Sequence, residues 1–144
     1  MEASLYRAEL LTSNVFERHW PNISEQLDTI PHVWEKWWTK DFLHCAPLAG
    51  RCQVWGIGDE KLRIIVYTQI INYPASSIFQ IFLAFGNDIE RCLPIMDALF
   101  EKVAKDSGCG SIEVIGRPGW ERKLQGFTRT AVILTRAVQQ HGVH

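Results

Sequence analysis

The apolar residues of this chain change their spacing after residue 85, and this change constrains the fold more than any other feature. Residues 52–57, 62–71 and 78–85 are rich in β-branched and aromatic side chains, with short turn sequences between them. Such runs predict three consecutive strands in an antiparallel meander. The apolar residues that follow recur instead at helical spacing, and they are Ile89, Leu93, Met96, Phe100 and Val103. The sequence therefore predicts a long helix directly after the meander.

The ends of this long helix carry recognisable signals. Asp88 is a suitable N-cap and Gly108 a suitable C-terminal stop. Pro94 predicts either a kink in the helix or its true first turn. The short apolar run at 111–115 predicts a strand after the helix. A strand, helix and strand in this order normally place the two strands parallel, with a right-handed crossover.

Weaker signals predict the remaining elements. Before the meander we expect a strand at 4–11, a short helix capped by Ser13 or Asn14 and interrupted by Pro21, a turn capped by Ser24, and a helix at 31–40. After residue 115 we expect a short helix at 118–125, a final strand at 130–138 and a loose tail at 139–144. This order predicts a single α/β domain over residues 1–144, in which helices cover a central, mostly antiparallel mixed sheet in three layers.

Composition excludes several classes of function. The chain has 144 residues and a formal net charge of −1, which fits one globular domain and gives no bulk attraction to nucleic acid or anionic lipid. No uninterrupted apolar run approaches the ~18 residues of a membrane span. The N-terminus carries charges and lacks the apolar core of a signal peptide. We therefore expect neither a membrane nor nucleic acid as a partner.

Cysteine and histidine positions give no metal site. The cysteines are Cys45, Cys52, Cys92 and Cys109, and none of them forms a C-x-x-C pair. His141 and His144 are three residues apart but lie in the tail predicted to be loose. We therefore assign no metal and expect buried, reduced thiols in a protein kept in a reducing cytoplasm.

The C-terminal third carries a family resemblance. Residues 109–127, with the sequence CGSIEVIGRPGWERKLQGF, resemble the fifth strand, the fourth helix and the closing Gly-Phe of the GNAT N-acetyltransferase fold. The predicted order of elements is similar to that of the GNAT superfamily over nearly the whole chain. The piece 116–124, together with residues 53–55 and 73–74, resembles more closely small GNAT-like proteins of tailed phages and prophages.

The resemblance implies where a cofactor would bind. GNAT enzymes hold the pyrophosphate of acyl-CoA on free backbone amides at the start of the long helix, where the helix dipole also attracts anions. The corresponding residues are Gly86, Asn87, Asp88, Ile89, Glu90 and Arg91. Only one of them is glycine, and two are carboxylates. We expect the carboxylate of Asp88 or Glu90 to satisfy these amides and to repel an anionic ligand, so that the chain uses no cofactor.

The resemblance also implies a proton donor that this chain lacks. Many GNAT enzymes protonate the departing thiolate with a tyrosine, but the corresponding position is Arg122, and no tyrosine follows Tyr73. Arginine keeps its proton at neutral pH and is not a useful acid. A general base could come from Glu113, His32 or His44. For Glu113, alternation within its strand is equally consistent with a surface carboxylate. We therefore assign no catalytic residue, with Glu113 as the base if the protein is active.

Two groups of residues are candidates for partner contacts. Trp34, Trp37 and Trp38 share one face of the helix predicted at 31–40. They either pack in the core or form a partner-binding surface, because tryptophan is favoured at interface hot spots. Base stacking is a third interpretation, but the nearby basic residues are balanced by acidic ones. Around the predicted short helix lie further candidates, which are Arg117, Trp120, Arg122, Lys123 and Arg129. They form either a solvated face or a contact surface.

These observations lead to a functional hypothesis with two alternatives. We expect a non-catalytic GNAT-fold phage protein that acts as a virion structural or assembly component. Its partners would be other virion proteins and further copies of itself in a homo-oligomeric ring, and it would move from the host cytoplasm into the virion. The first alternative is an acetyl-CoA-dependent N-acyltransferase acting on an amine. The second is a small regulatory or host-interaction protein that is absent from the virion.

Overall fold

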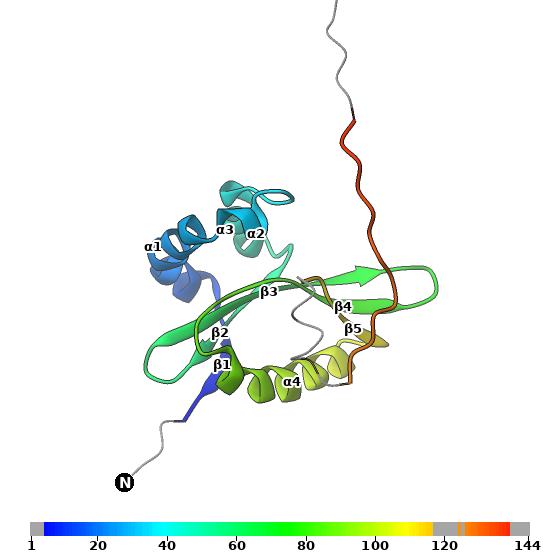
Figure 1. The fold of residues 1–144 in the computed structure, drawn as a ribbon. Helices are drawn as coiled ribbons and strands as arrows, with labels where there is room; N and C mark the ends of the chain where they lie inside the picture. Colours follow the sequence, from blue (N-terminus) through cyan, green and yellow to red (C-terminus); the bar gives the residue numbers. More distant parts are fainter. Residues whose placement is uncertain (1–4, 117–123, 125, 139–144) are drawn as a thin grey trace, which may run out of the picture.

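The computed structural model describes residues 5–116, 124 and 126–138, and its centre is one five-stranded sheet (Figure 1). The strands lie in chain order across the sheet: β1 (Arg7–Leu10), β2 (Gln53–Gly58), β3 (Leu62–Asn72), β4 (Ser77–Gly86) and β5 (Ser111–Val114). Neighbouring strands are antiparallel except for β4 and β5, which are parallel. The predicted meander and the parallel pair around the long helix are confirmed.

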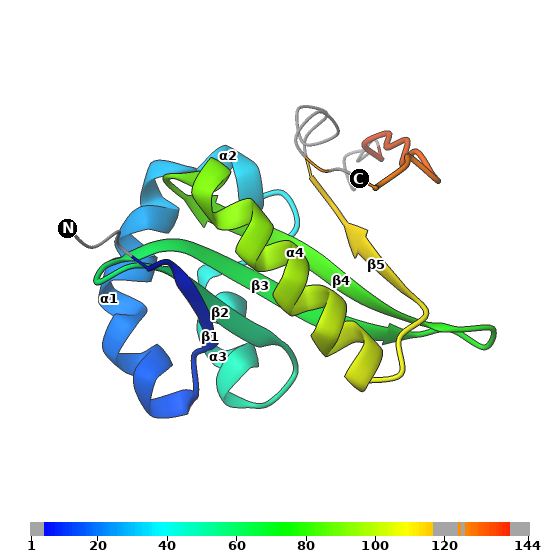
Figure 2. The same cartoon turned by 90° about the horizontal axis from the view of Figure 1, so that it is seen from below.

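Helices cover both faces of this sheet (Figures 1 and 2). One face carries α1 (Ser13–Thr29), α2 (Pro31–Trp34) and α3 (Lys40–Leu48), and the other carries α4 (Ile89–Asp106). Each face has its own apolar core. Alternation along the strands sends Ile65 and Tyr67 of β3 toward α1–α3, and Ile64 and Val66 toward α4. The predicted three-layer arrangement is therefore confirmed.

The helical half before β2 differs from the prediction at several points. The N-cap of α1 is Thr12 rather than Ser13 or Asn14, and Ser24, which was predicted to cap a separate turn, lies inside the helix. Pro21 does not interrupt α1, which runs continuously from Ser13 to Thr29. A proline inside a helix removes one hydrogen bond and clashes with the preceding turn. The helix persists because Phe16, Ile23 and Leu27 lie on one face and are fully buried in the core. Tertiary packing has overridden the local signal.

The predicted helix at 31–40 is also wrong. α2 ends at Trp34, and a separate helix, α3, begins at Lys40. Thr39 starts it, because its side-chain Oγ1 accepts a hydrogen bond from the amide of Phe42 at 3.1 Å. A threonine before a helical run is an N-cap signal that the sequence carried and our prediction did not use.

The four thiols divide into two kinds. Cys52 and Cys92 are buried, and desolvation raises the pKa of each to about 11, so both remain protonated at neutral pH. Cys45 is exposed and Cys109 is half-buried, so the prediction of buried thiols is wrong for Cys45. All four are free in the structure.

Among the described residues no group of histidine, cysteine and carboxylate side chains could hold a metal ion. No helix in the described part of the chain is long and apolar enough to cross a membrane.

A β-bulge changes the course of β4 in its middle. Thr68 pairs with Ile81 whereas Tyr67 pairs with Leu83, so Phe82 is an extra residue on β4. β5 pairs with β4 only before this point, from Ile78 to Ile81. The last contact is the hydrogen bond from the amide of Ile115 to the carbonyl of Ile81, at 3.0 Å. Beyond it, in the part of the chain that the structure describes, residues 82–86 have no strand partner on the β5 side.

Tyr67 ties the helical layer to the sheet. Its side chain is completely buried, and its hydroxyl donates to the backbone carbonyl of Leu43 on α3 at 2.8 Å. Burial raises the pKa of this phenol, so it remains a donor at every accessible pH. Tyr67→Phe leaves the buried carbonyl of Leu43 unpaired. We expect the free energy of unfolding to fall by about 1–3 kcal/mol.

Urea denaturation checks this prediction, with Tyr73→Phe as the matched control. Tyr73 is 53% exposed, so loss of its hydroxyl should leave the unfolding free energy within about 0.5 kcal/mol of the wild type. Equal effects of the two substitutions would mean that the Tyr67 hydrogen bond contributes nothing.

The predicted C-terminal strand is absent from the sheet. Residues 126–138 include no strand, and Thr130 to Val138 are all exposed. The segment has strong β propensity, but a strand also needs a neighbour to accept its backbone hydrogen bonds. The helix predicted at 118–125 and the loose tail at 139–144 fall almost entirely outside the described residues.

Candidate functional site

The connection from β4 to α4 is only two residues long, and Gly86 is the strand residue before it. Gly86 has a φ of 135°, which residues other than glycine rarely adopt. A Cβ atom at this position would lie 2.1 Å from the carbonyl oxygen of Arg63 on β3. The next amide, of Asn87, donates to that same oxygen at 2.9 Å. The missing side chain of Gly86 therefore leaves room for the backbone of β3.

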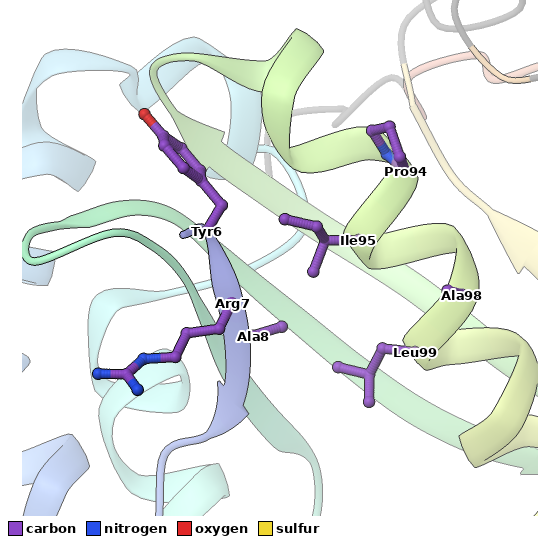
Figure 3. A pocket seen from close by; sticks show the side chains of 7 residues that line it. All are labelled: Tyr6, Arg7, Ala8, Pro94, Ile95, Ala98 and Leu99. Atoms are coloured by element: carbon purple, nitrogen blue, oxygen red, sulfur yellow. The ribbon is translucent and has the colours of Figure 1, made fainter. Parts of the chain in front are cut away.

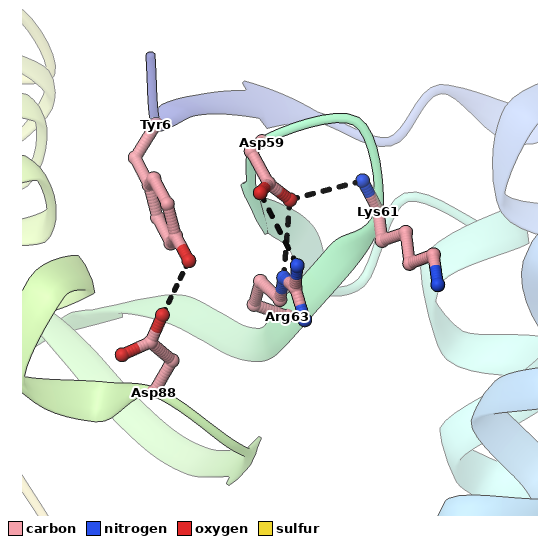
Figure 4. A network of polar contacts seen from close by, with 5 residues as sticks. All are labelled: Tyr6, Asp59, Lys61, Arg63 and Asp88. Carbon is pink, nitrogen blue, oxygen red and sulfur yellow. Dashed lines mark hydrogen bonds and ion pairs between the residues drawn. The ribbon is translucent and has the colours of Figure 1, made fainter. Parts of the chain in front are cut away.

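Asp88 occupies the N-cap position of α4 in an unexpected way. Its φ and ψ are 62° and 40°, in the left-handed region, and its side chain makes no capping hydrogen bond. The carboxylate instead accepts a hydrogen bond from the hydroxyl of Tyr6, next to β1 (Figure 4). This contact raises the pKa of Tyr6. The expectation that the Asp88 carboxylate satisfies the helix amides is therefore wrong.

Two arginines balance the acidic groups around this helix end. The guanidinium of Arg91 lies over the ring of Tyr6, 5.6 Å from its centroid, and its hydrogen bond to Tyr6 raises its own pKa. Arg63 binds both carboxylate oxygens of Asp59, at 3.0 and 3.2 Å (Figure 4). Arg63 holds the pKa of Asp59 at about 2, with help from the amide of Lys61. The N-terminus of α4 thus has positive as well as negative neighbours.

Glu113 belongs to a polar ladder across three strands. The amide nitrogen Nε2 of Gln69 on β3 donates to Oε1 of Gln80 on β4 at 2.7 Å. Nε2 of Gln80 then donates to Oε1 of Glu113 on β5, also at 2.7 Å. Gln80 is only 6% exposed, so its amide is held firmly. Its strand neighbours Phe79 and Ile81 face α4, which places the ladder on the opposite face of the sheet.

The structure keeps Glu113 and the start of α4 apart. Glu113 pairs with Gln80, which lies six residues before Gly86 on β4. At ~3.3 Å per residue the two regions are roughly 20 Å apart along the strand. They lie on either side of the point where β5 leaves β4. A ligand that touches both must therefore be long, with its anionic group and its reacting group well separated.

The two histidines proposed as bases lie elsewhere, on the helices. His44 of α3 contacts the carboxylate of Glu17 and stacks on Trp20, with the ring centroids 4.3 Å apart and the planes 3° from parallel. His32 lies exposed on α2. The partners of His44 come from α1, so its contacts are explained by packing between helices.

The tryptophans proposed as a partner surface do not share one face. Trp34 is buried, and its Nε1 donates to the carbonyl of Leu27 at 2.9 Å. Trp38 packs against Phe82 at 4.7 Å between ring centroids. Trp37 is 61% exposed, with the ammonium of Lys36 over its ring. Two of the three tryptophans serve the core, and Trp37 alone remains available to a partner. Arg117, Trp120, Arg122 and Lys123 lie outside the described residues.

A shallow groove between β1 and α4 was not predicted from the sequence. It has a volume of about 540 Å³ and is lined mainly by apolar side chains (Figure 3). The lining residues are Tyr6, Arg7, Ala8, Pro94, Ile95, Ala98 and Leu99. Tyr6 links this groove to Asp88, 82 residues later in the chain. No local sequence signal could have joined two segments so far apart.

Comparisons with known proteins identify the fold. No family model and no curated protein matches the sequence. Among solved structures, the chain is similar to a ribosomal-protein-alanine N-acetyltransferase from Brucella melitensis biovar Abortus 2308. The TM-score is 0.66 at 14% identity, over 94% of this chain and 99% of that one.

Two further solved structures give the same result. An aminoglycoside acetyltransferase from an uncultured soil metagenomic sample, in complex with sisomicin, has a TM-score of 0.65 at 11% identity, over 94% of this chain and 97% of that one. A GNAT family acetyltransferase from Staphylococcus aureus has a TM-score of 0.57 at 12% identity, over 94% and 100%. The chain therefore has the fold of the GNAT acetyltransferases. Identities this low show the fold and leave the activity to be argued from the site.

Proposed function

We propose that this protein is an N-acyltransferase that takes its acyl group from acyl-CoA and transfers it to an amine. The proposal reverses the order of our two leading hypotheses. The observation that carries it is the orientation of Asp88, whose carboxylate turns to Tyr6 and makes no capping hydrogen bond to the first turn of α4. The non-catalytic hypothesis depended in part on the carboxylate of Asp88 or Glu90 satisfying the helix amides, and in part on the missing tyrosine.

The residues around α4 fit the diphosphate of a coenzyme. The first amides of an α-helix lack partners within the helix, and the helix dipole adds positive potential there. Arg91 brings a guanidinium to the same turn, and Gly86 and Asn87 are exposed beside it. β4 and β5 are paired only as far as Ile81. The stretch in which the two strands are not paired therefore lies between the start of α4 and the region of Glu113. A long, extended ligand matches the separation between the two regions.

The chain's own residues suggest a division of roles. The amides of Ile89, Glu90 and Arg91 would bind the anionic end of acyl-CoA, which supplies an activated thioester. Glu113 would take a proton from the acceptor ammonium and leave the neutral amine that can attack. The hydrogen bond from Gln80 fixes one oxygen of Glu113 and so orients the carboxylate. Arg122 keeps its proton at neutral pH, so no general acid is assigned.

Calorimetric titration with acetyl-CoA tests the binding step. The Asp88→Asn variant tests in addition how the charge at this position affects the affinity. Removing one negative charge near the diphosphate should tighten binding about fivefold, since such a charge contributes about 1 kcal/mol at 4 Å in water. Asparagine also tolerates the left-handed conformation of Asp88. Glu101→Gln removes a charge from an exposed position in the C-terminal half of α4 and should leave the affinity unchanged. No heat of binding with the wild-type protein would contradict the proposal.

Glu113→Gln tests the transfer step. It keeps an oxygen that can accept from Gln80 but removes the base, so we expect turnover to fall by about 100-fold or more with acetyl-CoA affinity unchanged. Thiol release can be followed with polyamines, aminoglycosides and peptides that have free N-termini as acceptors. A Glu113→Gln protein as active as the wild type would assign the base elsewhere.

A non-catalytic assembly role remains the second candidate. It is favoured by the 61% exposure of Trp37 and by the absence of any tyrosine after Tyr73. This role predicts that the protein copurifies with phage particles in fixed stoichiometry and gives no heat with acetyl-CoA. Binding of acetyl-CoA without incorporation into particles would select the enzyme.

A further inference from the structure

The sheet has an open edge at β5. β5 is the last strand in the sheet order, and in the part of the chain that the structure describes no strand pairs with its outer side. An edge strand presents unpaired backbone N–H and C=O groups, which can bind another strand. The apolar side chain of Ile115, at the end of β5, is 42% exposed. The edge can therefore accept one more strand.

The chain also carries an unpaired segment with the properties of a strand. Residues 130–138 read TAVILTRAV, with one charge and strong β propensity. Four of their apolar side chains are exposed by 63% to 90%, and these are Val132, Ile133, Leu134 and Val138. In an extended conformation Val132 and Leu134 would lie on one face and Ile133 on the other. Apolar residues on both faces are typical of a strand covered on both sides.

The segment begins at a fixed point and then leaves its own domain. Phe127 and Leu124 line a small cavity together with Phe100 of α4 and Val114 of β5, which anchors the chain beside that strand. From there the segment runs away from the sheet, in the orange to red part of Figure 1. The 11 residues from 128 to 138 can reach roughly 36 Å when extended. That length is enough to cross to a neighbouring molecule.

We propose that residues 130–138 pair with the outer edge of β5 in a second copy of this chain, and that the exchange is reciprocal. In the part of the chain that the structure describes, each copy carries the outer edge of β5 and the unpaired apolar segment 130–138, so two copies related by a twofold axis satisfy both. Reciprocal exchange closes the assembly as a dimer. The strand adds main-chain hydrogen bonds, and its apolar side chains are removed from water. This inference is independent of the proposed enzymatic activity.

Light scattering coupled to size exclusion tests the assembly across a range of protein concentrations. The wild-type chain should be a dimer. Leu134→Pro removes a backbone donor from the middle of the segment and should raise the dimer dissociation constant by at least about tenfold. Thr135→Ser keeps the backbone donor and is the matched control, with wild-type behaviour expected. A wild-type monomer, a larger or open-ended assembly, or an unaffected Leu134→Pro dimer would each overturn the proposal.

Isotope-filtered nuclear Overhauser spectra identify the contact directly. In a mixed sample of labelled and unlabelled chains, methyl groups of Ile133 and Leu134 in one chain should lie close to the amides of β5 in the other. If these contacts appear only within one chain, the segment pairs with its own β5 and the proposal of exchange is wrong.

Discussion

Gly86→Ala should lower the free energy of unfolding by about 3 kcal/mol or more. Two causes act together. A φ of 135° is strained for any residue with a side chain, and such strain costs about 1–3 kcal/mol. The new methyl group would also lie 2.1 Å from the Arg63 carbonyl, and forcing extra atoms into a packed site costs about 1–3 kcal/mol. β3 and β4 must separate, or the backbone of Gly86 must change.

Gly110→Ala is the matched control for this substitution. A methyl group at Gly110 would meet nothing within 4 Å, and its backbone does not lie at positive φ. Its unfolding free energy should therefore stay within about 0.5 kcal/mol of the wild type. Chemical denaturation of the three proteins measures the difference. A Gly86→Ala protein as stable as the wild type would show that β3 and β4 do not need this close approach.

Phe100→Ala should lower the free energy of unfolding by about 3–5 kcal/mol, the range for deletion of a buried aromatic ring. Phe100 is 2% exposed on the face of α4 that packs on the sheet. Its ring makes an edge contact with Trp55 and a tilted contact with Phe79, each at 5.4 Å between centroids. Its removal leaves a cavity between α4 and two strands.

Glu101→Ala is the control on the same helix, because Glu101 is exposed and its replacement should be nearly neutral. Thermal unfolding of both variants gives the comparison. A Phe100→Ala protein that loses less than about 1 kcal/mol would mean that α4 is not fixed by this contact. The position of its N-terminus, and with it the candidate site, would then need another explanation.

The sequence predicted those parts of the fold that depend on hydrophobic period. The three strands of the meander and α4 each bury a regular set of side chains, so their patterns survive in the structure. Local signals failed where packing opposed them. Pro21 lies within α1 because Ile23 and Leu27 hold the helix in the core.

The prediction of a strand in the C-terminal segment was wrong for a different reason. Its composition at 130–138 indicates a strand, but a strand is defined by its partner, and no local pattern names that partner. We predicted a strand from β propensity alone, whereas a strand in the structure also requires a paired neighbour, which residues 130–138 lack in the described part of the chain.

The sequence predicted where the candidate site lies along the chain, but it did not predict the contacts that its side chains make. Asp88 was expected at the N-terminus of the long helix, and it lies there. Its contact with Tyr6 joins the residue before β1 to the start of α4, and a tertiary contact of this kind leaves no trace in the local sequence. The functional conclusion changed with that one side chain. The relation to phage proteins remains a prediction from sequence resemblance.

Backbone amide chemical shifts recorded during an acetyl-CoA titration test binding at the start of α4 residue by residue. We expect saturable shifts at Ile89, Glu90 and Arg91, with smaller changes along β4 toward Glu113 and none on α1. A titration that leaves the first turn of α4 unperturbed, while the protein remains folded, would contradict the proposed function.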